Sequence, residues 1–176
     1  MSSKTLLLSL FRYKSWADDE LLALMAGIEN DIAEDQLGAI LETINHAHVV
    51  DRIFASNIQK QKHFYRDTGT SNTPTLAELS AAITETDRWY LRYVEQVEPE
   101  ELAETILFTF TSGAPGQMSR EEMLAHVITH GGYHRGEVGR IVTQLSKSSS
   151  PDTFTGYLHQ AEPTRRAPLQ SEIFRT

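Results

Sequence analysis

The chain contains no cysteine among its 176 residues. This absence excludes disulfide bonds, thiolate metal ligands and a catalytic cysteine. Any metal ion must therefore be held by nitrogen and oxygen ligands. A chain without disulfides also fits a reducing compartment, so we expect a cytoplasmic protein.

Positive charge and long apolar runs are also scarce. The 16 Lys and Arg stand against 24 Asp and Glu, which gives a formal net charge of −8 and makes nucleic acid an unexpected partner. No apolar run approaches the ~20 residues that span a bilayer, so no membrane association is expected. The apolar patch near the N-terminus is broken by FRYKSW and lacks a small-residue cleavage site, so it does not read as a secretory signal. The remaining expectation is a globular domain that acts on a small molecule.

Four long segments place apolar residues three and four positions apart, the pattern of amphipathic helices. The expected helices cover 4–29, 34–61, 75–97 and 120–145. The sequences TLAE and SREE match capping boxes at the starts of the third and fourth helices. We therefore predict an all-α fold, an antiparallel four-helix bundle that buries four apolar stripes together.

A short insertion precedes the fourth long helix. The stretch ETILFTFTSGAPGQMS, residues 104–119, has β-branched and aromatic residues on both sides of a Gly/Pro turn. This pattern favours a hairpin over an irregular connection. After the fourth helix, PDTFTGYLHQ predicts one more short helix.

The C-terminal stretch shows no helical or strand period and contains two prolines. We predict one domain over residues 1–162 and an extended tail over 163–176. Apolar residues in that tail suggest contact with a second copy, and so a homodimer: Leu169, Ile173 and Phe174.

Three histidines recur at four-residue intervals in HVITHGGYHRGEV, residues 126–138. Histidines four apart on a helix have β-carbons about 6 Å apart, so either His126 with His130 or His130 with His134 can reach one ion. His126 and His134 lie about 12 Å apart along the axis, too far to share one. In an isolated helix such histidines are more often solvated or structural. The intervening Gly131 and Gly132 each cost about 1 kcal/mol against alanine, which indicates close helix packing or room beside an ion.

A further ligand has to come from another helix. INHAHVVDRIF, residues 44–54, offers His46 and His48, whose directions differ by roughly 200°. Only one of them can face the core, and periodicity leaves the choice open. His63, in a polar loop, is expected to be solvated, and His159 to lie at the surface.

Three segments together resemble the DinB-like metalloenzymes of the YfiT type. INHAHVVDRIF is similar to the family's second helix, where Asn-His is followed five residues later by Asp-Arg. HVITHGGYHRGEV is similar to its fourth helix, where a histidine precedes His-Arg-Gly by four residues, and RYKSWADDELL resembles its first helix. The order and separation match, so the resemblance covers about residues 5–160. Tyr133 and the Gly-Gly pair depart from the family's pattern without removing a ligand.

The resemblance implies a four-helix bundle that holds one divalent metal ion, zinc or nickel with iron as an alternative, through His46, His130 and His134. It selects His46 over His48. From its position one turn before the pair, His126 is expected at the rim of the pocket or behind a ligand. Characterised relatives include transferases and isomerases that use low-molecular-weight thiols, so it implies thiol-dependent group transfer with a thiol from outside. Metal-activated hydrolysis is one alternative. A non-catalytic stress-response or binding module, with a structural metal or none, is another.

Two residues near the histidines have open roles. Glu137, one turn beyond His134, is a candidate acceptor for a ligand's ring N–H or a general base, or else an exposed helix glutamate. Arg135 is a candidate for binding a substrate carboxylate, or else it pairs with an acidic neighbour. Asp51 is expected in a buried pair with an arginine between two helices. Tyr13 and Trp16 are expected in the core and the pocket wall.

Overall fold

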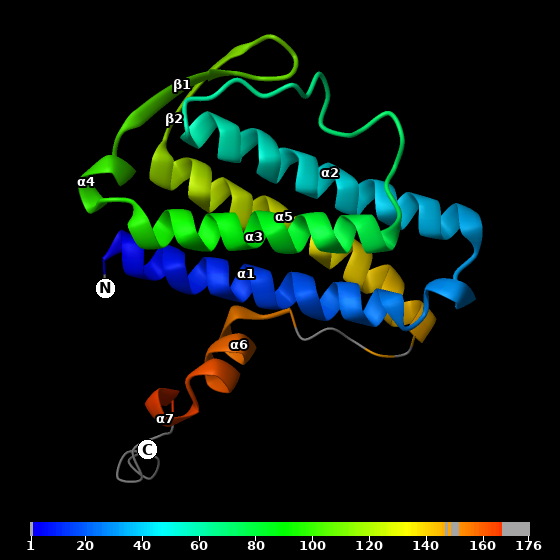
Figure 1. Ribbon diagram of the computed structural model, residues 1–176. Helices are drawn as coiled ribbons and strands as arrows, with labels where there is room; N and C mark the ends of the chain where they lie inside the picture. Colours follow the sequence, from blue (N-terminus) through cyan, green and yellow to red (C-terminus); the bar gives the residue numbers. More distant parts are fainter. Residues whose placement is uncertain (1, 147, 149–151, 167–176) are drawn as a thin grey trace.

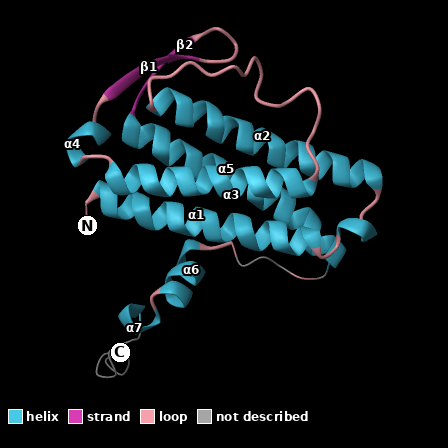
Figure 2. Cartoon of the chain, in the orientation of Figure 1, coloured by secondary structure: helices cyan, strands magenta, loops and turns pink. Residues whose placement is uncertain are grey.

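The computed structural model describes residues 2–146, 148 and 152–166. The chain is mostly helical, with one small antiparallel sheet (Figure 2). The helical class expected from the sequence is thus confirmed. Four long helices run side by side in Figure 1: α1 (Ser3–Ala26), α2 (Glu34–Ile58), α3 (Leu76–Gln96) and α5 (Arg120–Ser146).

Two apolar clusters fill the space between the long helices. α1 packs against α3 and α5, and α2 packs against α5 and α3. One cluster includes Phe11 and Tyr90, whose rings stack with centroids 4.9 Å apart. The other includes Met25 and Ile40. In α1, α3 and α5, buried polar residues lie between the two apolar sets along the helix, so a polar layer crosses the middle of the core.

Both predicted capping boxes are confirmed. Thr75 Oγ1 accepts a hydrogen bond from Glu78 N, and Glu78 Oε2 accepts one from Thr75 N. Ser119 and Glu122 make the same reciprocal pair at the start of α5. These side chains satisfy N–H groups that the first helical turn leaves without partners.

Helix ends differ from the prediction by a few residues. α1 stops at Ala26, and Glu29–Asp31 form a separate 3-10 turn, η1. α2 stops at Ile58 because Lys60 adopts a left-handed conformation, with φ of 57°, that turns the chain into the loop 59–75.

The predicted hairpin is confirmed as β1 (Thr105–Thr109) paired with β2 (Pro115–Ser119). Ile106 of β1 is buried in the core and lies opposite Met118. A short helix that the sequence analysis missed, α4 (Pro99–Leu102), leads into it. Proline in its first turn favours a helix start, and Glu98 and Glu101 exchange hydrogen bonds there.

The C-terminal segment forms α6 (Phe154–Ala161), as predicted, and then α7 (Pro163–Arg166). The extended-chain prediction is wrong for 163–166, where the carboxylate of Glu162 accepts from both arginines of a helical turn. The rest of the tail, with the three residues of the predicted dimer contact, lies outside the described residues. The domain boundary and the homodimer stay predictions.

The helix α6 packs against α1 (Figure 1). Tyr13 and Trp16 of α1 make ring contacts with Tyr157, and Tyr13 also contacts Phe154. The two α1 aromatics are half-buried under α6, so their predicted place in the core and pocket wall is wrong. Within the described ranges, no helix combines the length and apolar character needed to cross a bilayer.

Candidate metal centre

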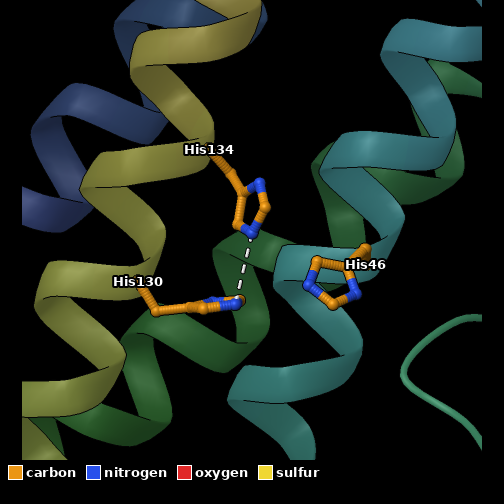
Figure 3. Close-up of side chains that lie close together, drawn as sticks. All are labelled: His46, His130 and His134. Carbon is orange, nitrogen blue, oxygen red and sulfur yellow. Dashed lines mark hydrogen bonds between the residues drawn. The ribbon is translucent and has the colours of Figure 1, made fainter.

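Three histidines from two facing helices converge at mid-length (Figure 3). His46 comes from α2, and His130 and His134 come from successive turns of α5. One ring nitrogen of each lies within 4.8 Å of the others, and all three side chains are half-buried. The direct packing of α2 on α5 therefore brings together residues more than eighty positions apart in sequence.

Two of the rings are held by their outer nitrogens. His46 Nδ1 lies 2.9 Å from the carbonyl oxygen of Thr68, and His134 Nδ1 lies 2.7 Å from Oε2 of Glu137. A carbonyl or carboxylate oxygen only accepts, so each Nδ1 carries a proton, and Nε2 is the nitrogen that can bind a metal ion when the ring is neutral. This is the arrangement that orients histidines around a metal ion.

His130 completes the group. Its Nε2 lies 3.2 Å from Nε2 of His134, while its Nδ1 is buried without a hydrogen-bond partner among the described residues. Burial lowers the pKa of His130 to about 4, and the neighbouring histidines add to this effect. The ring is thus neutral at pH 7, the form that binds a metal ion. The residues present fit such an ion, since three imidazoles suit zinc, nickel or copper.

Two further half-buried histidines, His48 and His126, do not belong to this three-histidine group. His48 Nε2 lies 3.1 Å from Thr86 Oγ1 on α3, and burial lowers the pKa of His48 to about 4. The ring of His126 stacks on that of His130 with centroids 5.2 Å apart, and it also stacks on the ring of Phe54 at 4.5 Å. The structure therefore places His46, and not His48, beside the α5 pair, with His126 behind His130.

The loop 59–75 is anchored next to the histidines. Besides the contact of His46 with Thr68, Asn45 Nδ2 donates to Thr70 Oγ1 at 2.7 Å. This role of the loop was not predicted from the sequence. The adjacent Asn45 and His46 on a core-facing helix could have indicated it, because buried polar side chains need hydrogen-bond partners from another segment.

A buried charged cluster lies under the centre. Lys14 Nζ of α1 pairs with Asp18 at 2.8 Å, Asp51 at 3.0 Å and Asp87 at 2.7 Å. Burial alone would lower the pKa of Lys14, but the three carboxylates hold it well above its usual value. The predicted buried partner of Asp51 was an arginine. The actual partner is this lysine, so the pair joins α2 to α1 and, through Asp87, to α3.

Arg135 belongs to the same polar layer. It is buried, with Nη1 3.2 Å from Asp18 and Nε 2.9 Å from Asp152. The structure thus shows the second of its two alternatives, pairing with acidic neighbours. A Cβ on Gly131 would lie 3.4 Å from both Lys14 Cε and Arg135 Nη1, so this glycine leaves room for the two cations.

Two exposed residues of α5 lie next to His134. Tyr133 is 65% exposed, and its ring stands edge-on to that of His134 with centroids 5.0 Å apart. Glu137 is also exposed. Of the two outlying histidines, His159 is at the surface as predicted, whereas His63 is half-buried rather than solvated.

These features define a helical protein with a three-histidine group able to hold a metal ion between two helices. The family model of the DinB family matches residues 1–167, and the chain belongs to this family. It is 24% identical over 160 residues to the protein DinB of Bacillus subtilis (strain 168), an alignment that covers 85% of this chain and 91% of that protein. The resemblance drawn from the three sequence segments is thereby confirmed.

Proposed function

We propose that this protein is a metal-dependent enzyme, an antiparallel four-helix bundle whose His46, His130 and His134 hold one zinc or nickel ion. The observation that carries the proposal is the convergence of three imidazoles, two of them with the outer nitrogen already tied to an oxygen acceptor. Three protein ligands leave a fourth position for water or substrate, which is typical of catalytic rather than structural sites.

The reaction we propose is thiol-dependent group transfer. When bound, the ion supplies Lewis acidity that lowers the pKa of a thiol or water at the open position. The chain has no cysteine, so the thiol enters from solution. Glu137, exposed beside His134, keeps that ring oriented, and we assign to it the role of taking up the proton of the entering thiol. The sulfur then forms a bond to the substrate carbon, and the leaving group departs with the electron pair of the bond that breaks.

Metal content tests the site. Untagged protein is incubated with zinc, dialysed and measured by elemental mass spectrometry, for wild type, His130→Ala and the surface control His159→Ala. We expect one ion per chain in wild type and in the control, and none in His130→Ala. The proposal is contradicted if wild type contains no zinc after dialysis, or if His130→Ala retains it.

A second arm of this experiment tests the chemistry. N-acetylcysteine is added to protein loaded with cobalt(II), and the absorption spectrum is recorded. Thiolate-to-metal charge transfer in wild type supports an open position that accepts a thiol. An unchanged spectrum in metal-loaded protein would reject the thiol reaction while leaving the metal site intact.

A further inference from the structure

A groove of about 630 Å³ lies between the start of the loop 59–75 and strand β1 with the turn that follows it. Figure 1 shows these two segments side by side above the end of α2. Small-molecule sites usually measure about 300–1,000 Å³, so the groove has a suitable size. None of His46, His130 and His134 lines it, which separates it from the candidate metal centre.

One wall of the groove is apolar and fixed in place. The rings of Phe108 and Phe110 meet edge-on with centroids 4.9 Å apart. Strand pairing sets Phe108 opposite Gly116, where a Cβ would lie 2.5 Å from Phe108 Cζ and 2.8 Å from Phe110 Cε2. The glycine thus lets both rings lie close against β2. Phe110 stays 47% exposed, so the wall presents apolar surface to the groove.

The opposite wall carries positive charge. Lys62 and Arg66 line the groove, are exposed, and form no ion pair with any described residue. Lys60 differs, because it is paired with Glu104. In a chain with a net charge of −8, two unpaired cations facing an apolar wall favour an anion at this place.

Polar atoms without partners lie against the same groove. Asn57 lines it, is only 7% exposed, and its Nδ2 has no hydrogen-bond partner among the described residues. His63, which is half-buried, also lines the groove, and its Nδ1 has no hydrogen-bond partner among the described residues. A buried donor left unsatisfied costs about 1–3 kcal/mol. Because both atoms are buried, an oxygen acceptor brought by a ligand would reach them only after the side chains rotate.

We propose that this groove binds an amphipathic organic anion. Its apolar or aromatic body packs on Phe108 and Phe110, and its carboxylate, sulfonate or phosphate lies at Lys62 and Arg66. The site goes beyond the proposed function, because its residues form it whether or not the three histidines hold a metal ion.

Two matched fluorescent probes test this site on the full chain. Anilinonaphthalene sulfonate is an aromatic anion, and N-phenylnaphthylamine carries the same rings without the sulfonate. We expect saturable binding of the anion at one site per chain. We also expect roughly tenfold to hundredfold weaker binding in the double variant Lys62→Ala/Arg66→Ala, the range that loss of charged hydrogen bonds produces. Phe110→Ala should weaken binding of both probes.

The controls separate this groove from other surfaces. Lys4→Ala/Arg92→Ala removes the same charge away from the groove and should bind the anion as wild type does, and so should His130→Ala. Circular dichroism and melting temperature establish that each variant is folded. The proposal is overturned if the anion does not bind, if Lys62→Ala/Arg66→Ala binds it like the charge control, or if the neutral probe binds as tightly. Loss of binding in His130→Ala would also overturn it, because the probe would then occupy the histidine centre.

Discussion

At the scale of single residues, Glu137 orients the imidazole ring of His134. Its carboxylate accepts the Nδ1 proton of His134 at 2.7 Å, which leaves Nε2 directed at the other two rings. Loss of such a partner typically lowers metal affinity about 10–100-fold. We therefore expect Glu137→Ala to weaken zinc binding by this factor, and Glu137→Gln, which keeps a neutral acceptor, to weaken it less. Competition with a chromophoric chelator measures both. Glu85→Ala, at an exposed glutamate of α3, is the matched control. Unchanged affinity in Glu137→Ala would show that the carboxylate does not support a ligand.

The same residues show what the sequence could and could not predict. Spacing alone found the His130–His134 pair, because four residues make nearly one helical turn. It could not choose between His46 and His48, since that choice depends on how α2 is rotated against α5. The resemblance to the family's second helix selected His46. The partners of Lys14 could not be predicted from the sequence, because the three carboxylates come from three helices and Asp87 lies 73 residues away in sequence.

At the scale of elements, the buried cluster ties α1, α2 and α3 together, and it makes their packing depend on pH. Burial is the main cause that raises the pKa of Asp87 from 3.8 to about 7 and that of Asp51 to about 6. A carboxyl whose pKa is raised by folding favours the folded state while it is protonated. This contribution is fully present below the unfolded value of 3.8 and is lost as pH rises through about 7.

Asp87→Asn tests this linkage, because asparagine resembles the protonated carboxyl at every pH. The quantity compared is the unfolding free energy of wild type minus that of the variant. We expect this difference to fall by on the order of 2 kcal/mol as pH rises from about 5 to about 8. Other groups with shifted pKa values, such as His48, occur in both proteins and largely cancel in the difference. Urea unfolding at several pH values measures it. A difference that does not change with pH would mean that Asp87 ionises normally in the folded protein.

The elements themselves were predictable where the chain carries local signals. Apolar periodicity and two capping boxes predicted the long helices, and a Gly/Pro turn between β-branched residues predicted the hairpin. The polar composition of residues 63–74 predicted a loop but not its path. That path depends on distant contacts, such as that of Thr68 with His46, which a single sequence does not encode locally.

At the scale of the whole molecule, an ion at the candidate centre would add a link between α2 and α5, which are joined by packing, by the polar layer and by a hydrogen bond from Arg120 Nη1 to the carbonyl oxygen of Ile58. An ion that binds the folded chain alone stabilises it by about 2.7 kcal/mol at a hundred times its dissociation constant. For a protein of this size, 1 kcal/mol corresponds to roughly 2–4 °C in melting temperature.

We therefore expect zinc at that level to raise the melting temperature of wild type by about 5–10 °C. His46→Ala removes the ligand on α2, so its melting temperature should barely respond, while His159→Ala should respond like wild type. Scanning calorimetry with and without the ion measures all three. The same rise in His46→Ala and in wild type would place the ion elsewhere, because the two ligands left on α5 cannot connect that helix to α2. No rise in wild type would mean that zinc does not bind the folded chain at this concentration, and that packing, the Lys14 cluster and the hydrogen bond from Arg120 to Ile58 hold α2 and α5 together without it.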